Sequence, residues 1–256
     1  MKIVEKEEIV MKTKKLTGRE KRLTRETTSM TCASMGLDAA VYSAALRYLF
    51  DRPVPEQGGQ EWYWDIDEPE FEATPLQWTH IQTVLFANAG TDLAPYSDDQ
   101  VGMGLNHLMS NNAGDIPHMV NDPSVPLVDA MRMVRALPTL WRDCLGPRLN
   151  TEQSAIGSRS DRLYFVSYMW FDVWPTFWNA KHIAEWQDAM WQVFCEMLAM
   201  PWREAQVSAL HGIGHEGRRL NRPKELQAHM DAFIRQVKND DELKTYAQAA
   251  ARGMVQ

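Results

Sequence analysis

Apolar residues recur every three to four positions along most of this chain, which is the spacing of amphipathic helices. The segment LDAAVYSAALRYLF, residues 37–50, is one example. Strict alternation of apolar and polar residues is scarce, and no strand–helix–strand pattern occurs. The sequence therefore predicts an all-α fold. Further helices are expected over residues 75–90, 101–110, 124–146, 163–178 and 183–200 and in the C-terminal region.

Capping residues and breakers place several helix ends. Thr74-Pro75 reads as an N-cap followed by proline at the first helical position, and that helix is expected to stop at Gly90. Ser97 with Gln100 three residues later forms a capping-box pattern. These pairs satisfy backbone N–H groups that a helix start leaves without partners, so they predict helix starts just after Thr74 and Ser97.

Prolines and glycines predict interruptions in the two longest apolar stretches. The helix over residues 124–146 should bend or break at Pro138 and close at Gly146-Pro147. Pro175 should kink or restart the helix over residues 163–178. Residues 147–160 are polar and without period, so they are expected to form a surface loop and a possible boundary within one all-α domain over residues 31–256.

The charge is uneven along the chain. Residues 1–26 contain nine Lys/Arg and five Glu, a surplus of four positive charges. Because the whole chain has a net charge of −7, the remainder carries −11. Residues 1–30 are expected to be a basic, partly disordered extension. The acidic remainder argues against a nucleic-acid partner, since DNA and RNA affinity depends on Lys and Arg at the phosphates.

Cysteine usage and hydropathy bear on the compartment. Cys32, Cys144 and Cys195 are odd in number, widely spaced and without a CxxC pair, which is typical of reduced thiols. No apolar run approaches the roughly 18–20 residues that span a bilayer. The N-terminus is too charged for the apolar region of a signal peptide. These features predict a cytoplasmic protein with no membrane partner.

Two C-terminal stretches repeat at an offset of 41 residues. EAQVSALHGIGH (204–215) aligns with TYAQAAARGMVQ (245–256), which pairs Gly212 with Gly253, and each stretch follows an apolar helix and a short turn. A period near 41 made of two helices resembles HEAT repeats. The resemblance covers residues 186–256 and implies helix pairs stacked into a solenoid, which presents extended binding surfaces. The N-terminal half shows no such period and is expected to be irregular helical structure.

Within the first of these stretches, SALHGIGHEG (208–217) places His211 and His215 four residues apart. Imidazoles at this spacing share a helix face and suit Zn²⁺, Fe²⁺ or Ni²⁺. A metal would need a third ligand, which the spacing does not supply. Candidates for that ligand are Glu216, His182 and His229. The favoured interpretation is a joint between repeats, in which Gly212 and Gly214 permit close packing and the histidines form hydrogen bonds; no metal or other cofactor is predicted.

The third quarter of the chain is rich in tryptophan. Six of the ten tryptophans lie between residues 170 and 202. They are Trp170, Trp174, Trp178, Trp186, Trp191 and Trp202. A stripe at helical spacing is typical of core packing. The break at Pro175 leaves a second interpretation, in which Trp170, Trp174 and Trp178 line a groove for a partner or small molecule. Asp172 lies within this run and would need a partner if buried, for which Arg162 or Arg203 is a candidate.

The segment EWYWDIDEPEFE, residues 61–72, combines six carboxylates with aromatic residues. The spacing is not that of a calcium-binding EF-hand loop. Trp62 and Trp64 can anchor a protein partner while Asp65, Asp67 and Glu70 steer a basic one; a solvated acidic loop is the alternative.

Taken together, these patterns favour a non-catalytic binding protein that engages a basic protein partner. Its predicted contacts are Trp62, Trp64, Asp65, Asp67, Glu70, Trp170, Asp172, Trp174 and Trp178. One form of this hypothesis is a bacterial immunity or inhibitor protein that neutralises a basic toxin. The alternative is an all-α enzyme, either a metal-dependent hydrolase using His211 and His215 or one with a pocket between Trp170 and Trp191. The pattern leaves the oligomeric state open.

Overall fold

Helices account for the regular structure of the part of the chain that the computed structural model describes, residues 30–56, 59–150, 154–175 and 182–255. No strand occurs within these ranges, so the all-α prediction is confirmed. The α-helices are α2 (Cys32–Met35), α3 (Ala39–Phe50), α4 (Pro75–Asp92), α5 (Asp98–Met109), α6 (Leu127–Leu140), α7 (Gly146–Leu149), α8 (Arg162–Val173), α9 (Ile183–Leu198), α10 (Arg203–Glu216), α11 (Pro223–Gln236) and α12 (Asp241–Ala250). Short turns of other helix types are η1 (Trp62–Trp64), η2 (Ile116–Asn121), η3 (Trp141–Leu145) and η5 (Gly217–Leu220).

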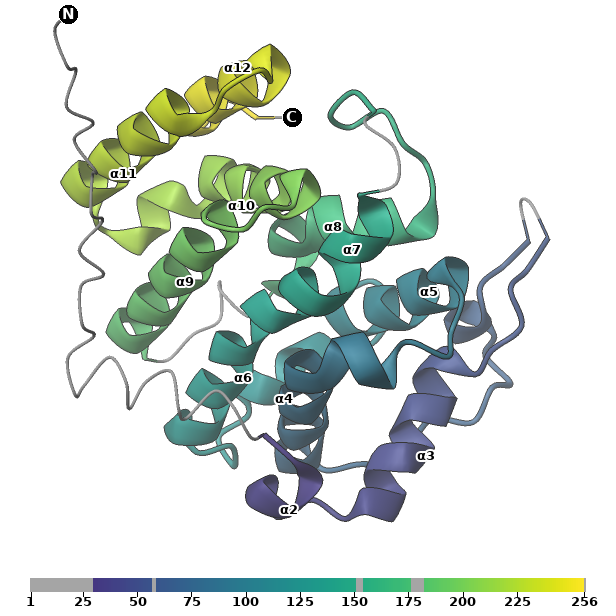
Figure 1. The fold of residues 1–256 in the computed structure, drawn as a ribbon. Coiled ribbons are helices and arrows are strands. Elements are labelled where there is room, and N and C mark those ends of the chain that lie inside the picture. The colour runs from purple at the N-terminus through teal and green to yellow at the C-terminus, as the bar shows by residue number, and fades with distance from the viewer. Residues whose placement is uncertain (1–29, 57–58, 151–153, 176–181, 256) are drawn as a thin grey trace, which may run out of the picture.

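Successive helices fall into two neighbouring rows (Figure 1). In one row α3 packs against α5, α5 against α8, α8 against α10 and α10 against α12. In the other, α4 packs against α6 and α6 against α9. The rows meet where α9 packs on α10. Consecutive long helices thus tend to alternate between rows, and each row joins segments far apart in the sequence.

The buried hydrophobic side chains form one cluster that extends from Met35 near the start of the described chain to Ala250 at the end of α12. Its largest fully buried side chains include Trp141, Trp170 and Trp174. The Trp141 Nε1 group donates a hydrogen bond to Ser167 Oγ at 3.1 Å. One continuous core therefore links the N-terminal helices to the C-terminal ones.

Helix starts follow the local capping signals. Thr74 and Gln77 form a reciprocal capping box at the start of α4, and Ser97 and Gln100 form another at the start of α5. The predicted stop at Gly90 is wrong, because α4 continues to Asp92. A Cβ atom at Gly90 would lie 2.7 Å from the backbone oxygen of Asp143. This glycine permits close packing rather than ending the helix.

Of the bend or break predicted at Pro138, the break is wrong, and the closure predicted at Gly146-Pro147 is wrong too. Pro138 lies inside α6, and the chain continues through the π-helical turn η3 directly into α7 at Gly146. In the wider turn the Gly146 N–H donates to the Trp141 carbonyl, five residues back. The surface loop predicted over residues 147–160 therefore begins only after Leu149. At Pro175 the prediction holds, since α8 ends at Val173 and Trp174 is extended.

Three further predictions concern the chain as a whole. The three cysteines are free thiols. Within the described ranges, no helix has the length and apolar character needed to cross a membrane. The basic N-terminal extension lies almost entirely outside the described residues, which begin at Met30.

Candidate functional site

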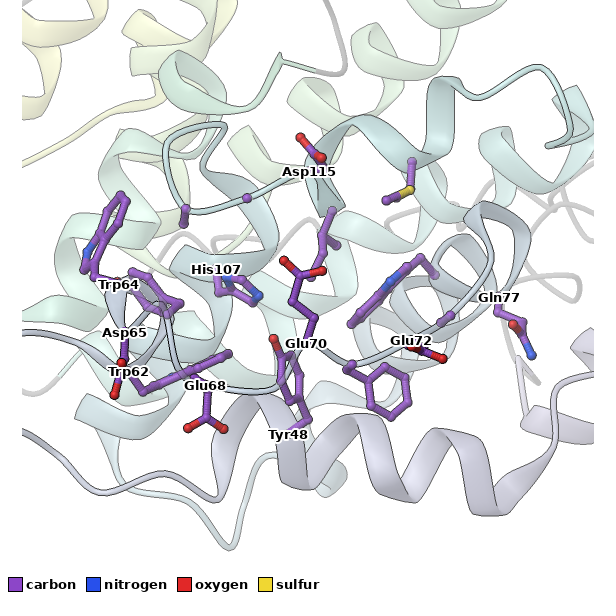
Figure 2. A pocket seen from close by; sticks show the side chains of 18 of the residues that line it. Tyr48, Trp62, Trp64, Asp65, Glu68, Glu70, Glu72, Gln77, His107 and Asp115 are labelled. Atoms are coloured by element: carbon purple, nitrogen blue, oxygen red, sulfur yellow. The ribbon is translucent and has the colours of Figure 1, made fainter.

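A cleft of about 920 Å³ opens between α3, the segment from η1 to the start of α4, and the region that follows α5 (Figure 2). The acidic and aromatic segment of residues 61–72 forms much of its wall. Clefts of this volume accommodate ligands of drug size or side chains of a protein partner. The cleft is therefore a candidate binding site.

Its aromatic side chains form a continuous chain of ring contacts. Tyr63 stacks on His107 with centroids 5.4 Å apart, and His107 meets Trp62 at 4.7 Å. Trp62 contacts Tyr48 at 4.9 Å, and the series continues from Tyr48 through Phe71 to Trp78. Trp64 extends it at the open end beside Tyr63, and 46% of its surface is exposed. The wall therefore presents aromatic faces and edges along the whole cleft.

Carboxylates surround these rings. They are Asp65, Glu68, Glu70, Glu72 and Asp115, and no lysine or arginine lines the cleft among the described residues. Figure 2 shows Glu70 in the middle of the cleft and Glu68 turned toward α3. Glu68 forms an ion pair with Arg52 at 2.5 Å. The other four carboxylates form no ion pair with any residue of the described ranges, so no described cation compensates their negative charge.

The wall is held in place by a polar network reaching α5 and α8. Arg162 donates to Glu61 at 2.8 Å and to Asp99 at 3.1 Å. Tyr63 donates its hydroxyl hydrogen to Glu61 and accepts a hydrogen bond from Asn106 at 2.7 Å. Because a residue of α8 clamps the turn η1 from outside, the aromatic wall is fixed before any ligand arrives.

Arg52 shows how these rings accommodate a cation. Its guanidinium lies over the rings of Trp62, at 4.5 Å, and Tyr48, at 4.9 Å, while it pairs with Glu68. Aromatic faces attract cations through their quadrupole, and nearby carboxylates add to the attraction. The same combination of rings and carboxylates, without a described cation, lines the open side of the cleft.

His107 is a buried side chain in this aromatic wall. Burial lowers its pKa to about 4, assisted by the positive charge of Arg52, while a backbone hydrogen bond with Ala113 opposes the shift. His107 is therefore a neutral imidazole at pH 7 and adds no positive charge to the cleft.

Most of the predicted contacts in residues 61–72 meet in this cleft. Trp62, Trp64, Asp65 and Glu70 all line it. Asp67 is exposed but does not line the cleft; its backbone N–H donates to the Asp65 carboxylate at 3.0 Å. The segment thus supplies both the aromatic and the acidic parts of the site.

The predicted contacts in the tryptophan-rich region lie elsewhere. Trp170 and Trp174 are 0% and 1% exposed, so they pack in the core and present no face to a partner. This placement fits the core interpretation of the stripe. The groove contact predicted at Trp178 falls outside the described residues.

Asp172 does not pair with Arg162 or Arg203, which corrects the partners expected from the sequence. Arg162 is engaged by Glu61 and Asp99, and Arg203 pairs with Asp240, Glu242 and Glu204. Asp172 Oδ1 instead lies 3.5 Å from Nδ1 of His215. The candidate third ligand of the histidine pair is therefore a residue of α8 that sequence spacing did not suggest.

The joint interpretation of HGIGH fits the packing of α10. A Cβ atom at Gly212 would lie 2.7 Å from the Phe194 ring and 2.8 Å from Phe171 Cβ. The glycine therefore lets α8 and α9 pack closely against the backbone of α10. His211 is buried and shares a hydrogen bond with the Tyr246 hydroxyl at 2.8 Å. Burial, together with His215, lowers the His211 pKa to about 3.

The two aligned glycines occupy different positions. Gly212 lies inside α10, whereas Gly253 follows α12 with a φ of 69°, a left-handed conformation that favours glycine. Gly253 nevertheless lies against α10, the helix that contains Gly212. A Cβ atom at Gly253 would lie 3.4 Å from the backbone oxygen of Gly214 in that helix.

Sequence reasoning missed part of the cleft. Tyr48 comes from α3, His107 from α5 and Asp115 from the turn before η2. None of them lies in a motif, and the packing of α3 against α5 brings Tyr48 and His107 together beside the acidic segment. Aromatic residues at helical spacing, such as the half-buried Tyr48, were the single available signal.

Comparison with protein-family models, with curated proteins and with solved structures finds no match to this chain. The function is therefore argued from the geometry of the sites.

Proposed function

We propose that this chain is a binding protein whose cleft receives positively charged side chains of a protein partner. The observation that carries the proposal is the set of four carboxylates without a described counter-ion around an aromatic wall. These four carboxylates are exposed and carry the same charge, so a cationic ligand would relieve their mutual repulsion. The geometry favours a ligand that brings lysine or arginine.

The shape of the cleft favours a segment of a macromolecule over a single small cation. Its volume of about 920 Å³ exceeds what one ammonium group fills. Trp64 and Ile66, which is 97% exposed, stand at its edge and offer apolar contact outside the charged centre. Aromatic anchors next to charged groups are typical of protein interfaces in which a few residues dominate the affinity.

The helical architecture supports the same class of function. Alternation of consecutive helices between two rows is the arrangement expected of a HEAT-like solenoid, and we extend this proposal to the pairs α9–α10 and α11–α12. Such scaffolds bind partners on extended surfaces without catalytic groups. An inhibitor or bacterial immunity protein that covers the basic face of an enzyme, such as a nuclease, would have this chemistry.

Titration with a hexa-arginine peptide tests the proposal. We expect the peptide to bind at low ionic strength, to change the fluorescence of Trp64, and to bind more weakly as salt is added. Glu70→Gln should lower the affinity by about fivefold or more, since one charge contact is worth roughly 1 kcal/mol or more.

The matched control is Glu185→Gln, which removes one negative charge from an exposed glutamate of α9 outside the cleft. It should leave peptide affinity unchanged within about twofold, because screening weakens distant charges. Equal losses in the two variants would show that the peptide senses only net charge, and the proposal would be rejected. Absence of binding at low salt would reject it as well.

A further inference from the structure

A second cluster lies far along the chain from the cleft, where α8 packs against α10. It consists of Asp172, His211 and His215, whose ligand atoms all lie within 4.8 Å of one another. The two imidazole centroids are 4.6 Å apart, and Asp172 Oδ1 is 3.5 Å from His215 Nδ1. Two imidazoles and one carboxylate form a donor set that Zn²⁺ and Fe²⁺ accept.

The packing of the joint brings these three side chains together. His211 and His215 share a face of α10 because they are four residues apart. Gly212, between them, allows Phe171 to lie against the backbone of α10. Asp172 is the next residue of α8, so the same close contact delivers its carboxylate to the histidines. The glycine that makes the joint therefore also sets the position of the third ligand.

His211 is already arranged as a metal-binding imidazole. Its Nδ1 atom is 2.8 Å from the Tyr246 hydroxyl, whereas Nε2 is buried and has no hydrogen-bond partner within the described ranges. The residue is only 1% exposed. A buried polar atom without a partner costs free energy, and ligating histidines commonly use their other nitrogen in a hydrogen bond of this kind. Tyr246 would fix the tautomer that leaves Nε2 available as a ligand.

We propose that Asp172, His211 and His215 bind a divalent transition-metal ion that ties α8 to α10. Ligand atoms bound at about 2.1 Å in tetrahedral geometry lie about 3.4 Å apart, so the cluster must contract on binding. Asp172 and His215 are 33% and 32% exposed and can rotate toward the buried His211. Three protein ligands leave the fourth position to water, as in catalytic zinc sites.

Metal binding to the chelator-treated protein tests this assignment directly. Titration with Zn²⁺ in competition with a chromophoric chelator should give one bound ion per chain. Co²⁺ should produce the visible absorption of a low-symmetry site. His215→Ala, which truncates a partly exposed side chain, should lower Zn²⁺ affinity by at least about 100-fold, and Tyr246→Phe by about 10-fold.

His118→Ala serves as the control because His118 is an exposed histidine on η2, outside the cluster. It should leave the stoichiometry and affinity unchanged. A stoichiometry below one, or equal affinity in the wild type and in His215→Ala, would overturn the proposal and leave the cluster as an ion pair within a joint. Glu70→Gln should retain full Zn²⁺ binding, so this test stands apart from that of the cleft.

Discussion

The cleft beside α3 and the histidine cluster between α8 and α10 differ in size, in exposure and in the elements that supply their polar groups. The cleft is open, and four carboxylates that lack a described counter-ion line it, three from the irregular segment of residues 61–72 and Asp115 from the turn before η2. The cluster is small and is built from two helices in close contact, with its central imidazole buried. In the cleft, exposed carboxylates from two loop segments surround an open space, whereas in the cluster three ligand atoms converge from two packed helices.

This difference determines the kind of ligand that each region fits. Backbone fixed on packed helices brings the ligand atoms near enough that side-chain rotation can complete a site for one ion, where errors of an ångström matter. An irregular wall with exposed rings tolerates a larger and less regular partner, and its charge acts over several ångströms. Tryptophan shows the contrast most directly, since Trp170 fills the core near the cluster while Trp64 stands at the edge of the cleft.

The largest predicted effect is the loss of stability in Trp170→Ala, compared with the small change expected in Trp64→Ala. Trp170→Ala should lower the free energy of unfolding by about 3–5 kcal/mol, because it leaves a large cavity in the core. Trp64→Ala should change stability by less than about 0.5 kcal/mol but weaken binding of the hexa-arginine peptide several-fold. Urea denaturation and peptide titration of both variants measure the two quantities. Wild-type stability in Trp170→Ala would contradict the placement of Trp170 in the hydrophobic core.

The same contrast explains which parts of the fold the sequence predicts. Starts of α4 and α5 depend on residues three apart, Thr74 with Gln77 and Ser97 with Gln100, so local reading finds them. Gly90 inside α4 instead packs against the backbone of Asp143, 53 positions along the chain. Local signals therefore predict the starts of α4 and α5, whereas tertiary contacts decide what a glycine inside a helix does.

The sites divide in the same way. Residues 61–72 carry the acidic and aromatic character of the cleft within twelve positions, and the sequence shows it directly. His211 and His215 are likewise visible as a pair. Asp172 is not, because it joins them only through the packing of α8 on α10 around Gly212. A third ligand that comes from another helix cannot be recognised from the spacing of residues along the sequence.

A smaller effect is expected from acidification, through His107 in the wall of the cleft. Its pKa of about 4 in the folded protein lies below the ordinary value of 6.5. Folded His107 therefore stays neutral while the unfolded chain takes up a proton below about pH 6.5. Stability present above pH 6.5 should fall as the pH drops toward 4, by up to about 1.4 kcal/mol per pH unit.

Comparison of the wild type with His107→Phe by urea denaturation at pH 7 and pH 5 measures this contribution. The variant should lose less stability than the wild type over that interval. His118→Phe, at an exposed position, should behave as the wild type does. An unchanged pH dependence in His107→Phe would show that the imidazole is accessible to protons in the folded wall, and the cleft would then carry less negative charge in mild acid.

The smallest predicted effect is a change in stability whose sign differs between a carboxylate of the cleft and a carboxylate on an ordinary helix surface. Glu70→Gln removes one of several neighbouring carboxylates and should raise stability by about 0.3 kcal/mol at low salt, because repulsion is relieved. Glu185→Gln removes a carboxylate from the first turn of α9, where the helix dipole favours negative charge, and should lower stability by about 0.3 kcal/mol. Both effects should shrink in high salt. If Glu70→Gln were also destabilising, a cation of the protein itself would have to satisfy Glu70, and the cleft would no longer favour a basic partner.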